Sequence, residues 1–144
     1  MSHDDQVIGY TAGAFDLFHI GHLNLLKSAK AHCDHLIVGV TADELILTTK
    51  GKRPFIPLAE RMEIIKSIVY VDEVVIQNDL DKVKAQEKYR YDILFSGDDW
   101  KSSPRWLDYK KQLDKKNIPI KYFSYTKSTS SSKIQNLITA NIEE

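Results

Sequence analysis

Short apolar runs alternate with stretches of helical periodicity along most of this chain of 144 residues. Three of the runs consist almost entirely of Val, Ile, Leu or Phe, which is typical of parallel strands covered on both faces. The runs predict strands at Val7–Thr11, Leu36–Val40, Val74–Ile76, Ile93–Ser96 and Ile120–Phe123. The periodic stretches predict helices near Gly21–His32, Leu58–Val69, Leu80–Tyr89, Trp106–Lys116 and Ser131–Ile142. The alternation therefore predicts an α/β fold built on a single doubly wound parallel sheet with right-handed crossovers.

Length and composition limit the class of protein. We expect one domain over residues 1–144, long enough to bury a core, with residues 1–6 flexible. Twenty basic and twenty acidic residues cancel, so the overall charge gives no reason to expect nucleic acid or a membrane as partner. Cys33 is the only cysteine, and the polar start of the chain lacks the apolar core of a signal peptide. The sequence therefore predicts a soluble, cytoplasmic protein.

Polar and glycine-containing segments follow four of the predicted strands. Ligands of doubly wound sheets bind beyond the carboxyl ends of the strands, where the strand order reverses. The segments are Gly13–His22 after the first strand, Asp43 and Lys50–Arg53 after the second, Gly97–Trp100 after the fourth and Thr126–Ser132 after the fifth. We therefore expect all four segments to gather at one rim of the sheet.

Gly13–His22 is the most informative of these segments, because it joins a buried strand to an amphipathic helix. A glycine-containing turn there points backbone N–H groups into a small space, and His19 and His22 lie on one face at the helix start. The histidines have three interpretations: packing or capping at a helix end, ligation of a metal, or donation to phosphate. A metal needs further ligands, and no Cys, His or carboxylate cluster stands nearby. The strand–turn–helix position favours phosphate, for which a neutral histidine is a sufficient donor.

Gly13, Asp16 and Asp43 each have a structural and a functional interpretation. Gly13 relieves crowding in a tight turn, or lets the backbone approach a nucleotide closely. Asp16 and Asp43 are most simply helix N-caps, but at the rim their carboxylates would also accept hydrogen bonds from the hydroxyls of an acceptor substrate.

Basic residues follow the second strand. Thr48–Pro57 is predicted as a loop because of its glycine and prolines, and it carries Lys50, Lys52 and Arg53. Such a run is usually a solvated surface, and the alternative is a loop that closes on phosphates when substrate binds. Arg61, early in the next helix, is by default one half of a surface ion pair.

Two further segments complete the predicted rim. Gly97–Trp100 has the composition of a turn, and it also offers carboxylate acceptors for an exocyclic amine and an aromatic face for a base or ribose. Ser130, Ser131 and Ser132 open the last helix. Capping explains only one of three serines, whereas a helix N-terminus with several hydroxyls is also an anion site.

Taken together, these motifs resemble the cytidylyltransferase branch of the nucleotidyltransferases that carry a His-x-Gly-His motif, and within it the glycerol-3-phosphate cytidylyltransferases. The resemblance runs from about Val7 to Ile138. The matching motifs are Gly13–His22, Tyr70–Val74, Gly97–Trp100 and Tyr125–Ser132.

The resemblance implies a Rossmann-like nucleotidyltransferase fold and the transfer of CMP from CTP to a small phosphate ester, with release of pyrophosphate. The implied acceptor is glycerol 3-phosphate or a related polyol or aminoalcohol phosphate, a precursor of cell-surface polymers or lipid headgroups. Mg²⁺ would arrive on the nucleotide, with no metal site of the protein's own, and the family resemblance suggests a homodimer. The implied catalytic residues are His19, His22, Lys50 and Lys52, and the implied acceptor-binding residues are Asp16, Asp43 and Arg61. The implied nucleotide-binding residues are Gly13, Ala14, Phe15, Gly21, Gly97, Asp98, Asp99, Trp100, Tyr125, Thr126, Ser130, Ser131 and Ser132.

Three positions depart from the family pattern. Val69 and Tyr125 stand where the family has arginines, and Ser128 stands where it has glycine. Two positive charges near the phosphates are therefore missing, which leaves the acceptor open. Two alternatives follow: an adenylyltransferase of the same superfamily, or a nucleotide-binding module without turnover.

Overall fold

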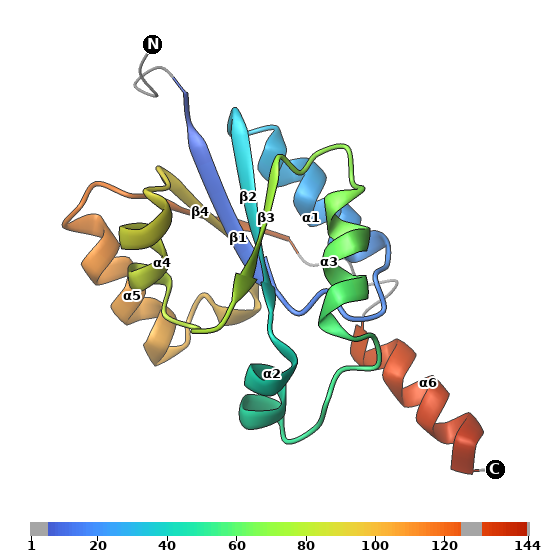
Figure 1. Ribbon diagram of the computed structural model, residues 1–144. Helices are drawn as coiled ribbons and strands as arrows, with labels where there is room; N and C mark the ends of the chain where they lie inside the picture. Colours follow the sequence, from blue (N-terminus) through green and yellow to red (C-terminus); the bar gives the residue numbers. More distant parts are fainter. Residues whose placement is uncertain (1–5, 125–130, 144) are drawn as a thin grey trace.

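Five parallel strands form one sheet in the computed structural model, which describes residues 6–124 and 131–143. The strand order is β3-β2-β1-β4-β5 (Figure 1). The strands are β1 (Ile8–Gly13), β2 (His35–Thr41), β3 (Glu73–Gln77), β4 (Ile93–Gly97) and β5 (Ile120–Phe123). Each matches a strand predicted from an apolar run, and the doubly wound parallel sheet is confirmed.

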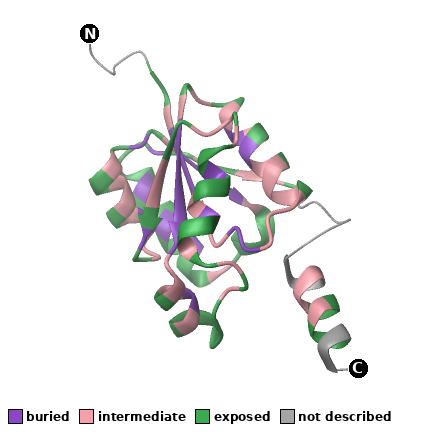
Figure 2. Ribbon diagram, turned by 45° about the vertical axis from the view of Figure 1, so that its right-hand side comes forward, coloured by how far each residue is buried: buried purple, intermediate pink, exposed green. Residues whose placement is uncertain are grey.

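Helices cover both faces of the sheet (Figure 1). The helices of the described residues are α1 (Ile20–Lys30), α2 (Asp43–Lys50), α3 (Leu58–Lys66), α4 (Lys82–Tyr89), α5 (Pro104–Asp114) and α6 (Ser131–Glu143). Of these, α2 lies beyond the end of the sheet and α6 projects away from it (Figure 1). α1 and α3 enclose one core with Leu26, Val38 and Ile65, while α4 and α5 enclose the other with Tyr91 and Trp106. The buried residues lie mainly along the central strands (Figure 2). Burial on both faces explains why β2 and β4 contain nearly continuous runs of Val, Ile, Leu and Phe.

The strand order reverses between β1 and β4, which are neighbours in the sheet. From β1 the chain builds β2 and β3 to one side, then crosses back to build β4 and β5 on the other. The buried Thr11 hydroxyl donates to the carbonyl of Phe95 at 3.0 Å and ties the two central strands together. The carboxyl ends of β1 and β4 therefore flank the crevice where ligands of such sheets bind.

The short helix α2 was not predicted, and Thr48–Lys50, expected in a loop, form its last turn. Its signals are present in the sequence: Asp43 and Glu44 in the first turn, and Gly51 just after the end with φ 75°. Asp43 is therefore the first helical residue, and Ala42 is the N-cap. Asp98–Trp100, predicted as a turn, form one turn of 3-10 helix.

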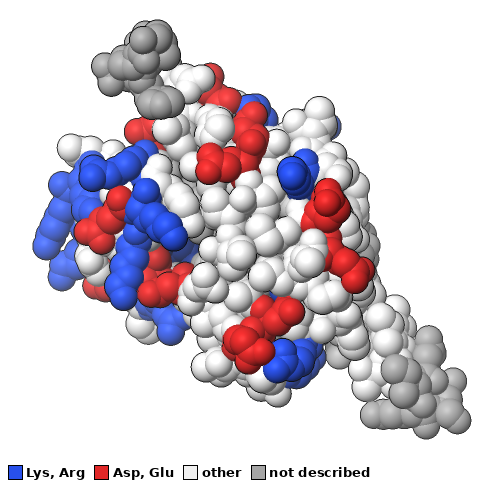
Figure 3. All heavy atoms as spheres, in the orientation of Figure 1, with Lys and Arg blue, Asp and Glu red and all other residues white. Residues whose placement is uncertain are grey.

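Charge is unevenly distributed over the neutral chain. Residues 82–90 and 104–116 hold nine Lys and Arg against three Asp and Glu. Basic side chains accordingly gather over α4 and α5 (Figure 3). Overall neutrality is therefore an incomplete guide to partners, and the predicted absence of nucleic acid stays a prediction. Among the described helices, none has the length and apolar character needed to cross a membrane.

Candidate active site

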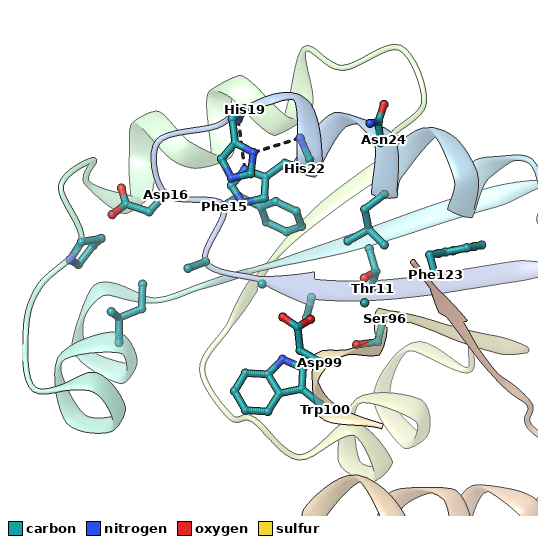
Figure 4. A pocket seen from close by; sticks show the side chains of 18 of the residues that line it. Thr11, Phe15, Asp16, His19, His22, Asn24, Ser96, Asp99, Trp100 and Phe123 are labelled. Carbon is teal, nitrogen blue, oxygen red and sulfur yellow. Dashed lines mark hydrogen bonds between the residues drawn. The ribbon is translucent and has the colours of Figure 1, made fainter. Parts of the chain in front are cut away.

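A cavity of about 360 Å³ lies at the carboxyl ends of β1 and β4, beside the first half of α1 (Figure 4). It brings together residues of three of the segments predicted to converge: Gly13–His22, Lys50–Arg53 and Gly97–Trp100. Asp43 is not among the lining residues, and for Thr126–Ser132 the convergence stays a prediction. Twelve of the predicted site residues line it: Gly13, Ala14, Phe15, Asp16, His19, Gly21, His22, Lys50, Lys52, Gly97, Asp99 and Trp100.

The turn after β1 is held in an unfavourable backbone conformation. Phe15 has φ 51° and Leu17 has φ 52°, both in the left-handed region that side chains of this size rarely adopt. A Cβ on Gly13 would lie 3.3 Å from the Phe15 ring, so a larger residue there would have to displace that ring by a few tenths of an ångström. Backbone strain of this kind persists only where the surroundings fix it.

His19 and His22 form the start of α1. The Nδ1 atom of His19 accepts from the Gly21 N–H at 3.1 Å, and the Nδ1 atom of His22 accepts from the His19 N–H at 3.3 Å. His19 is therefore the N-cap of α1, and the suggestion that Asp16 caps this helix is wrong. The imidazole rings stack with centroids 3.9 Å apart, and the rings of Phe15 and His22 pack in a T-shaped arrangement.

These contacts determine the charge and tautomer of the histidine pair. Burial and the neighbouring His19 lower the pKa of His22 to about 3, and burial also lowers the pKa of His19. Both rings are therefore neutral at pH 7. Because Nδ1 is the acceptor in each ring, the proton of the neutral form resides on Nε2. The pair thus presents two N–H donors, both of them Nε2 atoms.

The basic segment forms the wall beyond α2. Lys50 ends that helix, Lys52 and Arg53 follow Gly51, and all three basic side chains line the cavity while remaining exposed to solvent. Arg53 forms an exposed ion pair of 2.9 Å with Glu44. Exposed pairs of this kind contribute little stability, so Arg53 can exchange Glu44 for a phosphate at small cost.

The opposite wall comes from β4, β5 and the turn after β4. Asp99 and the largely exposed Trp100 line the cavity, whereas Asp98 does not. Partial burial and the neighbouring Asp98 raise the pKa of the Asp99 carboxyl. A carboxylate acceptor beside an aromatic face is suited to an amino-substituted base, as predicted for this segment.

The predicted acceptor-binding residues have other partners in the structure. Asp16 lines the cavity, but its carboxylate accepts from the N–H groups of Phe55 and Ile56, both at 2.9 Å. Asp43 pairs with Arg61, which is 1% exposed. The default interpretation of Arg61 as a surface ion pair is therefore wrong. Neither Asp43 nor Arg61 is among the residues lining the cavity.

Several lining residues were missed by sequence analysis. They are Thr11, Ala12, Asn24, Leu25, Ser28, Ile46, Pro54, Ser96, Phe123, Ser124 and Gln135. One signal was available, because Asn24 and Ser28 stand one helical turn apart and place two polar side chains on one face of α1. The β5 residues and Gln135 gave no comparable signal.

Part of the predicted site lies outside the described residues. Tyr125, Thr126 and Ser130 belong to this part. Ser131 and Ser132 open α6 as predicted, but their side chains are not described. Within the described residues, no three His, Cys, Asp or Glu side chains form a group that could hold a metal ion.

Fold and sequence together place the chain in the nucleotidyltransferase superfamily. More narrowly, it belongs to the cytidylyltransferase-like family, whose model matches residues 10–137.

Its curated relatives differ in length and in name. Over 96 residues the chain is 43% identical to ethanolamine-phosphate cytidylyltransferase of Arabidopsis thaliana. This match covers 62% of this chain but only 22% of the Arabidopsis protein. It is 35% identical to FAD synthase of Thermococcus sibiricus over 119 residues, 82% of this chain and 79% of that one. The chain thus spans about a fifth of the first relative and most of the second.

Among solved structures, the lipopolysaccharide core biosynthesis protein from Thermoplasma volcanium has a similar fold. The TM-score is 0.70 at 26% identity, and the match covers 86% of this chain and 99% of that chain.

Proposed function

We propose that the protein transfers CMP from CTP to a small phosphate ester and releases pyrophosphate. The observation that carries the proposal is the stacked, neutral pair of His19 and His22 in a cavity that also contains Lys50 and Lys52. Neutral donors of fixed tautomer and exposed lysines suit a triphosphate, and the family to which the chain belongs supports nucleotidyl transfer.

The reaction requires little proton transfer. A phosphate monoester has a second pKa of about 6, so it is mostly a dianion at pH 7 and attacks without a general base. One of its oxygens forms a bond to the α-phosphorus of CTP. At the same time the bond breaks between that phosphorus and the oxygen that bridges the α- and β-phosphates. Pyrophosphate leaves with the electron pair, and the product is CDP-linked.

The protein's task is then to position the reactants and stabilise charge. His19 and His22 donate from Nε2 to phosphate oxygens, where charge accumulates as pyrophosphate leaves. Lys50 and Lys52 neutralise the β- and γ-phosphates, and the backbone at Ala14 and Phe15 contributes N–H donors. Mg²⁺ bound to the triphosphate is part of the substrate in this proposal.

The second candidate is adenylyl transfer. It is favoured by the FAD synthase relative, which this chain matches over 79% of that protein's length. In this proposal the Asp99 carboxylate accepts from the exocyclic amine of the base, and the Trp100 ring stacks on the base. Cytosine and adenine both carry an exocyclic amine. The name of the Arabidopsis relative supports an aminoalcohol phosphate as acceptor in the cytidylyl case.

The experiment compares CTP with ATP against a panel of acceptors that includes ethanolamine phosphate, glycerol 3-phosphate and FMN, with pyrophosphate release as readout. The proposal expects release that requires CTP and one phosphate ester. Release with ATP and FMN identifies the adenylyl candidate. Saturable nucleotide binding without release in any combination identifies a non-catalytic module. Light scattering of the same protein tests the homodimer that belongs to this proposal.

A further inference from the structure

Arg61 is the largest fully buried side chain of the described residues. Its guanidinium donates to three backbone carbonyls: Nε to Ile56 at 2.8 Å, and Nη1 to Ala14 at 2.7 Å and Thr41 at 2.8 Å. Nη2 donates to the Asp43 carboxylate. The one side chain therefore connects the turn after β1, the end of β2, the start of α2 and the chain entering α3.

The bond to Ala14 acts on the turn that lines the cavity. The carbonyl of Ala14 and the N–H of Phe15 belong to the same peptide unit. A charged donor on the carbonyl polarises that unit and makes its N–H a stronger donor. The same bond also fixes the peptide that precedes Phe15, whose φ of 51° needs external support.

The bond to Ile56 acts on the other side of the cavity. The N–H groups of Phe55 and Ile56 donate to Asp16 at 2.9 Å each, and the carbonyl of Ile56 accepts from Arg61. This dipeptide is thus held on both sides directly after Arg53 and Pro54. The basic segment is anchored at one end by α2 and at the other by Asp16 and Arg61.

Arginine suits this position because its planar fork reaches several acceptors at once. A lysine has one nitrogen, so it cannot satisfy three carbonyls and a carboxylate that lie in different directions. Asp43 compensates the buried charge and also accepts from the Leu58 N–H at 3.3 Å.

We propose that Arg61 is a positioning residue that holds the Ala14–Phe15 peptide and the basic segment in one arrangement for a triphosphate. The inference rests on the proposed function for the identity of the substrate. The role it gives Arg61 concerns the geometry of the binding site and requires no direct contact between Arg61 and the acceptor substrate. Asp16 and Asp43 complete the same support.

The test combines amide NMR with titration of inorganic triphosphate, a probe that needs no turnover. In Arg61→Lys, the proposal expects changes in the Phe15, Phe55 and Ile56 amide signals, and triphosphate affinity about 10-fold to 100-fold weaker. Arg90→Lys is the matched control, because Arg90 is exposed at the end of α4 on the other face of the sheet. It is expected to bind as the wild type does.

Asp43→Asn keeps the guanidinium and removes the charge that orients it, so it serves if Arg61→Lys does not fold. The expected result is a smaller loss of affinity with changes in the same amides. Wild-type affinity and unchanged Phe15 and Ile56 amides in a folded variant overturn the inference, as does a wild-type protein that does not bind triphosphate. If the wild type binds triphosphate but never releases pyrophosphate, the proposed reaction fails and the amide comparison still decides the role of Arg61.

In variants that retain turnover, we expect a higher KM for the nucleotide and a lower kcat. The urea-unfolding midpoint of these variants is expected to show that they remain folded under the assay conditions, so lost stability does not explain either change. A variant whose kinetics are restored to wild type by stabilising conditions alone contradicts a positioning role.

Discussion

The neutral His22 predicts that stability falls steeply as the pH drops from 7 to 5. In the unfolded chain a histidine has a pKa of about 6.5, whereas burial and His19 lower the pKa of folded His22 to about 3. Between these two pH values the folded state therefore binds fewer protons than the unfolded state. The contribution of His22 to the free energy of unfolding is present above about pH 6.5 and is lost as the pH falls below it. For a single group, the loss between pH 7 and pH 5 is about 2 kcal/mol.

His22→Asn isolates this contribution. Asparagine keeps an acceptor near the position of Nδ1, so the contact with the His19 N–H can persist while the titrating group is removed. Urea unfolding of both proteins at pH 7 and pH 5 gives the comparison, and the carboxylates common to both cancel. We expect the wild type to lose about 2 kcal/mol more than the variant. Equal losses would refute the assignment of a neutral, partly buried His22.

Three further predictions concern the cavity and the core. Lys52→Met is expected to raise the KM for the nucleotide about tenfold, whereas Lys66→Met, an exposed lysine of α3, leaves steady-state kinetics unchanged; equal effects contradict a phosphate contact. Asp99→Asn is expected to reduce the ratio of kcat/KM for CTP to that for ATP, because it changes the acceptor facing the base; an unchanged ratio places base recognition elsewhere. Gly9→Ala is expected to lower the free energy of unfolding by about 1–3 kcal/mol, because the new Cβ would lie 2.5 Å from the Phe95 ring; unfolding at the wild-type midpoint refutes this.

The fold was predictable from sequence because its pattern is local. Most strands are marked by short apolar runs, such as Leu36–Val38 and Ile93–Phe95, and most runs are followed by a stretch of helical periodicity. The parallel order then follows from short right-handed crossovers. The helix α2 was missed because it has only eight residues and follows β2 after a single residue. The glycine and prolines of the next loop begin at Gly51, so the end of the helix was predicted as part of that loop.

The site was predictable in composition but not in partners. The turn at Gly13 and the histidine pair are contiguous in sequence, so their proximity needs no knowledge of tertiary structure. Arg61 and Asp43 lie 18 residues apart, and a charged residue is exposed in most proteins. Only the packed structure shows that their donors and acceptors are used internally, and that Asp16 holds the chain between α2 and α3.

Steady-state pyrophosphate release by His19→Ala and His22→Ala tests the central claim most directly. His35→Ala is the control, because His35 begins β2 at the opposite end of the sheet. With CTP and the acceptor found in the screen, the account predicts that each site variant loses about 100-fold to 1000-fold in kcat while remaining folded, and that the control keeps the wild-type rate. Folded His19→Ala and His22→Ala variants with wild-type kcat would contradict it.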